Sequence, residues 1–301
     1  MNTPHHLAIE KYNATLVEIK QITDQLRIFR IKPDFAMPKF KAGQFVTLGL
    51  GAWEGRAPGC QPEINVKTEK IGRRAYSVCS PVINDNGTIF DHNDSDWFEL
   101  YITLVTEGKD EEHAPFLTPR LFNLEVGDKI WINEKVAGHY ILEDIEENDD
   151  IIFLATGTGQ APHNTMLGTL LREGHKGRIL LMECNRTFDM CGYSETLLNL
   201  AEKYENVFYK QLATREGNDR CRIQQFIQDG RIESEFDMKI KPDSTRVFLC
   251  GNPAMIGIPK FKDGAVTYAS EGGVVEMLVN EYGLSVHHGH TPGEIYFEKY
   301  W

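Results

Sequence analysis

The sequence predicts two domains, an antiparallel β-barrel followed by an α/β domain built on a parallel sheet. Three observations lead to this fold class. The chain has 301 residues, which suits two domains of about 150 residues, each with its own core. Short β-rich runs separated by turn residues fill the first half. In the second half, apolar strands alternate with helical segments.

The runs in the first half are rich in Val, Ile, Thr, Tyr and Phe, and Gly, Pro, Asn and Asp bound them. Because no convincing amphipathic helix interrupts these runs, a closed antiparallel barrel is favoured. Two longer interruptions, residues 51–73 and 84–96, are expected to be surface excursions. The expected strands are residues 14–23, 26–32, 44–50, 74–80, 98–105 and 129–136.

An acidic segment separates the two halves. Residues 143–150 hold six acids in eight positions, and a block of like charge resists folding into a core. We therefore expect a linker here, with the boundary near Glu147 and domains at 1–147 and 148–301.

The pattern beyond this segment is that of a parallel sheet with helices on its faces. Strands are expected at 151–156, 178–184, 207–214 and 246–250, with a closing edge strand at 293–301. Helices are expected from the end of the first of these strands to Gly174, and at 194–204, 223–229 and 272–282.

Composition narrows the class of partner. The net charge of −12 argues against nucleic acid or an anionic membrane as the main partner. Residues 1–80 nevertheless hold 12 Lys and Arg against 7 Asp and Glu, a balance of +5, which leaves −17 for the remaining 221 residues. The N-terminal part is therefore locally basic, with Lys39, Lys41, Lys67, Lys70 and Arg73 among its cations.

No run of about 18 apolar residues is present for a membrane span, and the first ten residues lack the apolar stretch of a secretory signal. A cytoplasmic protein is expected. The six cysteines are scattered and none belongs to a Cys-x-x-Cys motif, so we expect reduced thiols, no metal site and no iron–sulfur cluster. They are Cys60, Cys79, Cys184, Cys191, Cys221 and Cys250.

One extended segment, Arg74-Ala75-Tyr76-Ser77-Val78-Cys79-Ser80-Pro81, combines a cation, a flat ring and hydroxyls. Side chains alternate along a strand, so Arg74 and Tyr76 share a face. A guanidinium suits a phosphate and a phenol ring suits a planar heterocycle, which together fit a dinucleotide. Taken alone, a half-buried sheet edge is the simpler interpretation.

Two turns in the second half fit a nucleotide as well. Gly157-x-Gly159-x-x-Pro162 directly follows a buried-type strand, where glycines let backbone N–H groups approach a pyrophosphate. Pro162 replaces the third glycine of the usual fingerprint. Cys250-Gly251-Asn252-Pro253 ends another strand at the edge where open α/β sheets bind ligands, although a tight turn with a buried cysteine explains it equally well.

Three arginines follow strands of the same sheet. Arg186, Arg215 and Arg222 could converge on one anion, as the 2′-phosphate of NADP requires. Glu183 complicates this interpretation, because an acid at the end of the second strand often binds the 2′-hydroxyl of NAD. Three cations against one acid favour NADP.

The chain stops on Tyr300-Trp301. A terminal aromatic is usually frayed or packed as core, but one that ends a sheet strand could cover a flat ring. Together and in this order, these features resemble the ferredoxin–NADP reductase family, and within it the bacterial ferredoxin/flavodoxin–NADP reductases. The resemblance runs from about Ala14 to Trp301. Its specific parts are Arg74-Ala75-Tyr76-Ser77, Leu117-Thr118-Pro119-Arg120-Leu121 followed by Glu125-Val126-Gly127-Asp128, Ala155-Thr156-Gly157-Thr158-Gly159, Cys250-Gly251-Asn252-Pro253 and Tyr300-Trp301.

The resemblance implies that the first domain binds FAD. Arg74 would hold the pyrophosphate, Tyr76 would stack on the isoalloxazine and Ser77 would hydrogen-bond near N5. Backbone N–H groups around Leu117 and Thr118 would complete the phosphate site. Ala75, Tyr101 and Ile102 are the further FAD-binding residues that the resemblance implies.

The resemblance also implies that the second domain binds NADP. Arg186, Arg215 and Arg222 would take the 2′-phosphate, Cys250 would lie beside the nicotinamide, and Trp301 would cover the flavin face that the nicotinamide must reach. The residues implied for the pyrophosphate and nicotinamide are Thr156, Gly157, Thr158, Gly159, Gly251, Asn252 and Pro253. Tyr76, Ser77, Cys250 and Trp301 are the expected catalytic set.

The implied activity is electron transfer between NADPH and an acidic one-electron carrier, a ferredoxin or flavodoxin, by a monomeric enzyme. One alternative is a reductase component that serves an oxygenase or another acceptor. Another is a non-catalytic flavin-binding subunit. The chain departs from the family pattern in residues 51–73, 84–96, 110–116 and 257–273, whose roles stay open.

Overall fold

The computed structural model describes residues 12–64, 66–262, 265–268, 271–289 and 291–300. The chain divides into two compact units. Unit 1 consists of Met1–Ser80 and Asp91–His139, and unit 2 consists of Pro81–Phe90 and Tyr140–Trp301. The chain therefore passes from one unit to the other three times.

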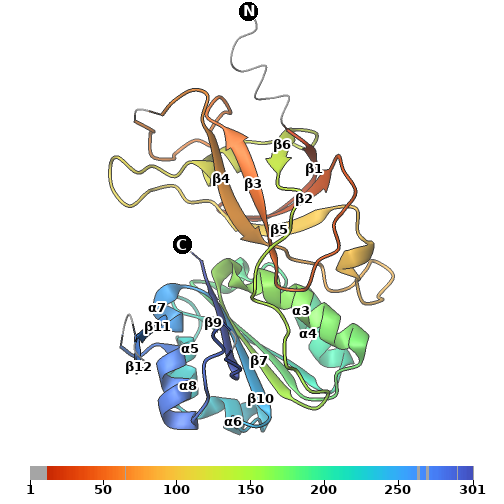
Figure 1. The fold of residues 1–301 in the computed structure, drawn as a ribbon, viewed down its shortest axis with the longest axis vertical. Coiled ribbons are helices and arrows are strands. Elements are labelled where there is room, and N and C mark those ends of the chain that lie inside the picture. Colours follow the sequence, from red (N-terminus) through yellow and green to blue (C-terminus); the bar gives the residue numbers. More distant parts are fainter. Residues whose placement is uncertain (1–11, 65, 263–264, 269–270, 290, 301) are drawn as a thin grey trace, which may run out of the picture. The chain divides into compact units, whose positions relative to one another are not determined.

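Unit 1 is an antiparallel six-stranded sheet in the order β4-β3-β6-β1-β2-β5 (Figure 1). An antiparallel bridge between Cys79, just beyond β4, and Glu99 of β5 links the two edge strands. This is the predicted barrel. Its strands are β1 (Ala14–Thr23), β2 (Leu26–Pro33), β3 (Phe45–Gly51), β4 (Ile71–Ser77), β5 (Phe98–Thr103) and β6 (Lys129–Ile132).

The core of unit 1 follows from alternation along these strands, because every second side chain faces inward. Leu16, Phe29, Leu48 and Phe98 are buried in one cluster. Two short helices join the strands, the 3-10 helix η1 (His92–Asp94) and α2 (Leu117–Leu121). The sequence pattern misses α2 because five residues are too few to show a 3.6-residue period.

Two strand ends of unit 1 differ from the prediction. β4 begins and ends three residues earlier than expected, because Cys79 no longer pairs with β3 and its N–H donates to Glu99 O (2.8 Å). β6 ends at Ile132 rather than at residue 136. The chain beyond Ile132 keeps only isolated bonds, such as Ala137 N–H to Phe45 O (3.0 Å).

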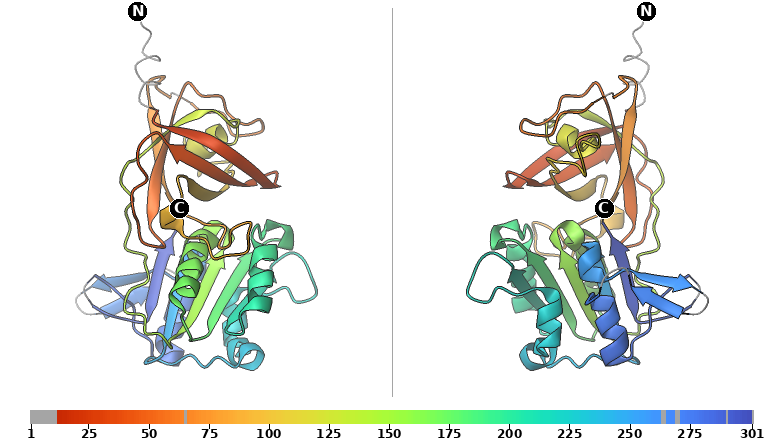
Figure 2. Two further views of the ribbon diagram at one scale, coloured as in Figure 1. Left: turned by 90° about the vertical axis from the view of Figure 1, so that its right-hand side faces the viewer. Right: turned by 90° about the vertical axis from the view of Figure 1, so that its left-hand side faces the viewer.

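Unit 2 is a parallel five-stranded sheet in the order β13-β10-β7-β8-β9. Helices α3 and α4 cover one face, and α5, α7 and α8 cover the other (Figures 1 and 2). β13 is the edge strand that the sequence predicts. The main elements are β7 (Asp150–Thr156), α3 (Gln160–Glu173), β8 (Ile179–Asn185), α4 (Ser194–Lys203), β9 (Val207–Ala213), α5 (Ile223–Gln228), β10 (Thr245–Gly251), α8 (Val274–Tyr282) and β13 (Ile295–Lys299).

Unit 2 also contains elements that the sequence pattern does not predict. Two short 3-10 turns, η2 (Gly157–Gly159) and η3 (Phe188–Met190), follow β7 and β8. Helices α6 (Arg231–Phe236) and α7 (Pro253–Ile256) are short, and the hairpin β11 (Pro259–Lys262) and β12 (Ala265–Tyr268) lies in the long 257–273 stretch. Gly257 and Gly273 close the base of that stretch, since a Cβ on Gly273 would lie 2.2 Å from the Cα of Gly257.

The acidic segment 143–150 belongs to unit 2, where its last two residues are packed and Asp144, Glu146 and Glu147 are exposed. Asp150 begins β7 and pairs with Arg178 at 2.8 Å, while Asp149 is buried and lies 3.4 Å from Arg246. Cations from distant parts of the chain therefore neutralise the two acids at the end of the segment. Residues 81–90 also lie on unit 2, where the carbonyl of Phe90 accepts from Arg172 (3.4 Å).

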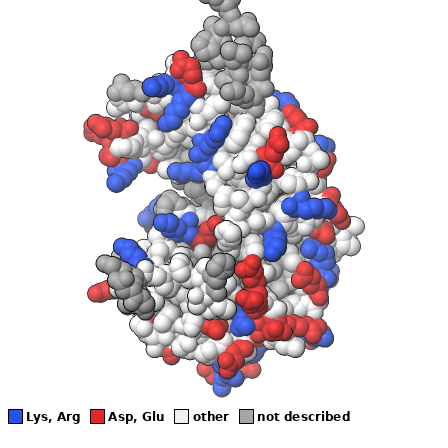
Figure 3. Space-filling view, in the orientation of Figure 1, with Lys and Arg blue, Asp and Glu red and all other residues white. Residues whose placement is uncertain are grey.

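Charge is unevenly spread over the visible surface. On the face shown in Figure 3, Lys and Arg side chains lie over the β4 region of unit 1, whereas Asp and Glu gather over the lower part of unit 2. No helix in the described part of the chain is long and apolar enough to cross a membrane. All six cysteines are free thiols.

Candidate functional site

Strand β4 presents the first group of predicted site residues. Arg74 and Ala75 are exposed, Tyr76 is half-buried against the barrel core, and Ser77 is buried. Tyr76 pairs with Val46 of β3, and its side chain packs against the core cluster of unit 1. Its hydroxyl is buried, has no hydrogen-bond partner in the described part of the chain, and its pKa is raised by that burial.

Arg74 supplies an available cation on the same strand. Its guanidinium forms no ion pair with any described residue. A free guanidinium two residues from an aromatic ring on one strand face is the arrangement expected for a phosphate and a flat heterocycle. An orphaned buried hydroxyl beside it indicates a polar group that a ligand would satisfy.

Helix α2 packs beside β3 and β4 in the same unit. Leu117 and Thr118 are buried, and the Thr118 hydroxyl accepts from the N–H of Val105 (3.1 Å). The Thr118 side chain is therefore occupied in holding the loop after β5. Only the backbone N–H of Thr118 is considered as a ligand contact. Tyr101 and Ile102 are buried on β5.

In unit 2, two glycines bring the β7 turn against the end of β10. A Cβ on Gly159 would lie 2.3 Å from the carbonyl oxygen of Cys250, and one on Gly251, whose φ is +123°, would lie 2.3 Å from Thr156 Oγ1. The N–H of Asn252 donates to Thr156 Oγ1 (2.8 Å). The two turns that the sequence singles out, Thr156–Gly159 and Cys250–Pro253, are thus in contact at the carboxyl edge of the sheet.

Cys250 is fully buried at this edge. Burial raises the pKa of its thiol well above the usual range, and the nearby Glu298 adds to the rise. Strand β13 runs beside it, with Cys250 opposite Glu298 and the N–H of Tyr300 donating to Gly251 O (2.9 Å). The predicted role of Trp301 concerns a residue outside the described part of the chain.

The three arginines lie where β8 and β9 end. The N–H of Arg215 donates to Arg186 O (2.9 Å), which fixes these two residues side by side, and the carbonyl of Cys221, next to Arg222, accepts from the Cys184 thiol at the end of β8 (3.8 Å). All three side chains are exposed, and none forms an ion pair within the described residues. They form a cationic edge suited to a phosphate.

Residues 153–260 match the family model described as an oxidoreductase NAD-binding domain. A flavodoxin/ferredoxin–NADP reductase from Buchnera aphidicola subsp. Schizaphis graminum is 28% identical over 248 residues, which cover 81% of this chain and 86% of the relative. The flavodoxin/ferredoxin–NADP reductase of Escherichia coli (strain K12) is 27% identical over 246 residues, covering 80% and 85%. A ferredoxin NADP+ reductase from Neisseria gonorrhoeae, solved with bound FAD and NADP, has a TM-score of 0.71 at 23% identity and covers 96% of this chain and 98% of that one.

This chain is similar to ferredoxin–NADP reductases over most of its length, at 28% identity or less. The resemblance read from the sequence and the two-domain fold class are thereby confirmed.

Within unit 2, Glu183 is not the nucleotide-facing acid that its position at the end of β8 suggests. It is fully buried, and its carboxylate accepts from Asn185 Nδ2 (2.8 Å) and from the hydroxyl of Tyr209 (2.9 Å). Burial raises the pKa of Glu183 to about 7, although these hydrogen bonds lower it in part. The Glu183 carboxyl therefore does not counter the preference for a 2′-phosphate that the three arginines indicate.

A buried polar pair of unit 2 has no counterpart among the predicted site residues. Tyr140, the first residue of unit 2 after the barrel, is hydrogen-bonded to His163 Nε2 of α3 (2.8 Å). Burial lowers the pKa of His163 to about 3, so the ring is neutral, and its Nδ1 has no described partner. The signal that could have drawn attention to it is a histidine at the fourth position of the helix that follows the glycine-rich turn.

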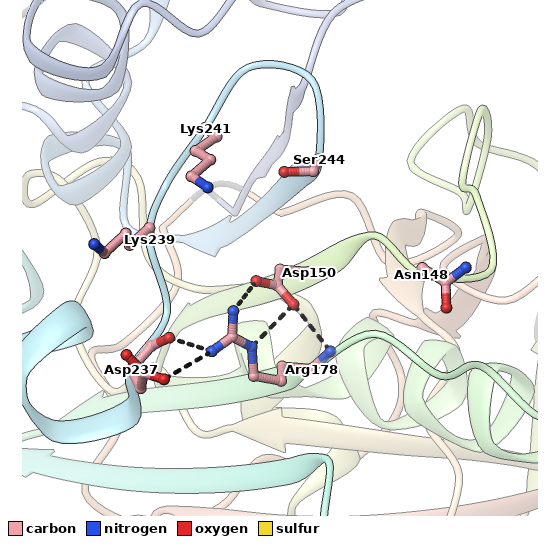
Figure 4. A pocket seen from close by; sticks show the side chains of 7 residues that line it. All are labelled: Asn148, Asp150, Arg178, Asp237, Lys239, Lys241 and Ser244. Atoms are coloured by element: carbon pink, nitrogen blue, oxygen red, sulfur yellow. Dashed lines mark hydrogen bonds and ion pairs between the residues drawn. The ribbon is translucent and has the colours of Figure 1, made fainter.

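A polar hollow of about 390 Å³ lies at the opposite, amino edge of the unit 2 sheet (Figure 4). Arg178 dominates it, but Asp150 and Asp237 neutralise its guanidinium. Ligands of open parallel sheets bind at the carboxyl edge. We therefore interpret the hollow as a structural ion-pair cluster.

Proposed function

We propose that this protein is an FAD-dependent oxidoreductase that transfers electrons between NADPH and a one-electron carrier protein, a ferredoxin or a flavodoxin. The observation that carries the proposal is the pair of surfaces described above. One has a free guanidinium and a half-buried tyrosine on β4, and the other has two glycine-closed turns beside three unpaired arginines. The reductases named above supply the activity.

The residues of unit 1 fit FAD. Arg74 is the proposed partner of the pyrophosphate, together with backbone N–H groups at Leu117 and Thr118. The ring of Tyr76, supported by the barrel core, is proposed to stack on the isoalloxazine, and Ser77 is proposed to hydrogen-bond to it. Ala75, Tyr101 and Ile102 are proposed to line the same site.

The residues of unit 2 fit NADP. Gly159 and Gly251 let the two turns pack together, because a Cβ at either position would not fit, and the turns Gly157–Gly159 and Gly251–Pro253 are the proposed contacts of the pyrophosphate and the nicotinamide. Arg186, Arg215 and Arg222 are the proposed 2′-phosphate ligands, and Glu183, buried and already hydrogen-bonded, is not available to a ribose hydroxyl. NADPH is therefore proposed over NADH.

When bound, FAD supplies the hydride and single-electron chemistry, and the protein supplies position and electrostatics. Thr156 holds the Asn252 turn through its hydroxyl, so the carboxyl edge keeps one shape for the nicotinamide. The Cys250 thiol, fully buried and with a raised pKa, stays protonated and uncharged. No described residue need act as a strong general base, since correct placement of the reactants is the main catalytic contribution.

The proposed carrier is acidic. Lys67, Lys70 and Arg73 are exposed at the end of the β3–β4 loop and the start of β4, and complementary charge mainly raises the rate of encounter. Electron transfer to an acidic ferredoxin should slow steeply as salt rises from about 10 mM to 300 mM, because exposed charges are screened. A flat salt response would rule out this docking surface.

The purified protein tests the proposal directly. We expect a yellow protein whose extracted cofactor is FAD, and whose visible absorbance is bleached without oxygen by NADPH much faster than by NADH. A protein that retains or takes up no flavin contradicts the proposal. Flavin binding without bleaching by either nicotinamide would instead indicate a non-catalytic flavin-binding subunit.

The finer assignments are part of the same proposal. Residues 1–147 are proposed as the FAD domain and 148–301 as the NADP domain. The six free thiols suit a reducing compartment, and the cytoplasm is proposed as the location. A monomer is proposed, and sedimentation equilibrium of the FAD-loaded protein checks it.

A further inference from the structure

Two loops of unit 1 form one brace around α2. They are the β3–β4 loop, residues 52–70, and the β5–α2 loop, residues 104–116. From the sequence alone, neither has an assigned role. In the structure, both are joined to each other and to α2 by hydrogen bonds between residues far apart in the chain.

Gln61 joins the two loops. Its backbone N–H donates to Thr106 O (2.8 Å), and its side-chain oxygen accepts from the N–H of Gly108 (2.7 Å). Its side-chain amide donates to the carbonyls of Asp110 (2.8 Å) and Glu111 (3.1 Å). One side chain therefore fixes the path of the second loop over several residues.

Arg120 of α2 is held by the first loop. Only 2% of its side chain is exposed, and it forms a two-pronged ion pair with Glu63 (2.6 and 2.8 Å). It also donates to the carbonyls of Phe116 (2.7 Å) and Ala52 (3.3 Å). Breaking such a pair leaves a buried charge without its partner, which makes the contact sensitive to substitution.

The brace also sets how α2 meets the sheet. The guanidinium of Arg120 lies 4.0 Å from the centre of the Phe116 ring. That ring occupies the space that a side chain at Gly72 of β4 would need, since a Cβ there would lie 2.1 Å from Phe116 Cδ1. Further along, the N–H of Ala57 donates to Pro119 O (2.8 Å). The loop side of α2 is therefore fixed against β4, two residues from Arg74.

We propose that Glu63, Arg120 and Gln61 are positioning residues that set Leu117 and Thr118 relative to Arg74, so that both sides of the cofactor's phosphate site are in place before the cofactor binds. The inference rests on the proposed function, because it takes the FAD phosphates as the ligand of this segment. Preorganisation of this kind improves affinity by removing the cost of ordering a loop on binding.

Binding of FAD and of riboflavin to the cofactor-free protein tests the proposal. Riboflavin has the same isoalloxazine but no phosphate. In Glu63→Gln, which keeps the shape but removes the charge, we expect the Kd for FAD to rise on the order of tenfold, or about 1.4 kcal/mol. The Kd for riboflavin should stay within about twofold. Gln61→Ala, which leaves the buried arginine paired, should act in the same direction.

Hydrogen exchange supplies a readout that does not involve the cofactor. In cofactor-free Glu63→Gln, the amides of Leu117, Thr118, Arg120 and Leu121 should exchange faster than in the unmodified protein, because local opening becomes easier. The control is Asp34→Asn, which removes an ion pair with Lys129 (2.8 Å) elsewhere in unit 1. It should change neither the FAD affinity nor exchange in α2.

The outcomes separate the two proposals. If the unmodified protein binds FAD and Glu63→Gln binds it equally well, or loses FAD and riboflavin affinity by the same factor, the brace has no phosphate-positioning role. If the unmodified protein binds no flavin, the proposed function and the brace both fall.

Discussion

Glu183 gives the most quantitative prediction. The substitution is Glu183→Gln, which mimics the protonated acid and keeps its shape. The side chain is fully buried, and burial raises its pKa from the usual 4.5 to about 7. The folded protein thus binds this proton more tightly than the unfolded chain does. Its contribution to stability is complete below pH 4.5 and is lost as the pH rises through about 7.

The size of the effect follows from the pKa. A rise from 4.5 to about 7 corresponds to about 3 kcal/mol, at roughly 1.4 kcal/mol per pH unit. At pH 5 the folded protein holds Glu183 neutral, and Glu183→Gln should have about the same free energy of unfolding. At pH 8 the buried carboxylate is charged, and the variant should be more stable by up to about 3 kcal/mol.

The assay is urea unfolding of FAD-loaded protein and variant at pH 5, 6, 7 and 8. The difference between the two proteins isolates Glu183 from every other titrating group. A constant difference across this range would refute the reasoning. The same variant should leave the KM for NADH and NADPH within about twofold, because Asn185 and Tyr209 hold the carboxylate away from ligand.

Three further changes bear on the nucleotide edge. Replacing Arg186 and Arg215 together by Ala should raise the KM for NADPH at least about tenfold, since charge-assisted hydrogen bonds are worth about 1.5–3 kcal/mol each. In the same steady-state kinetics, the KM for NADH should change little. Equal effects on the two KM values would contradict the 2′-phosphate assignment. Gly159→Ala should lower the free energy of unfolding, measured by thermal denaturation, by on the order of 1–3 kcal/mol, because its Cβ would lie 2.3 Å from a carbonyl oxygen of the neighbouring strand. The matched control is Gly168→Ala, whose Cβ would have its nearest contact at 3.7 Å. This control should leave the stability unchanged or raise it. Removing Trp301 should improve kcat/KM with NADH by easing nicotinamide entry, and an unchanged value would mean that the residue has no gating role.

The order of helices and strands could be predicted because each one has a signal in its own stretch of sequence. Alternation over residues 14–23 gives β1 at its observed bounds, and the apolar run before Gly157 gives β7. The carboxyl ends of parallel strands meet at one edge, so the placement of Arg186 and Arg215 after successive strands was enough to predict that they lie together. Their contact is confirmed by the Arg215-to-Arg186 backbone bond.

The state of Glu183 could not be predicted in this way. Its position after β8 is equally compatible with a ribose ligand and with a buried acid. What decides is Tyr209, which lies on β9 and donates to Glu183 across the β8–β9 pair. Strand register and rotamer determine that contact, and neither has a local sequence signal.

The acidic segment shows the same limit for charge. Six acids in eight residues repel one another in isolation, which predicts a solvated linker. Arg178, Lys176 and Arg246 supply the opposing charge, and they lie far along the chain from the acids that they pair with. A run of like charges in the sequence therefore shows only the net charge of that segment. The fold can still place such acids in a packed position by bringing cations beside them.

The brace extends this argument from charge to function. Gln61 and Glu63 lie in residues 51–73, which look like a departure from the family pattern, whereas Arg120 lies in a segment that carries the resemblance. Their pairing spans 57 residues between Glu63 and Arg120. Loops tolerate insertions most readily where they do not disturb the sheet, but these two insertions meet over one short helix and bury an arginine there. Removing a charge from water costs free energy, which the ion pair with Glu63 must offset. The segment that this buried pair makes rigid is the one proposed to hold the cofactor phosphates.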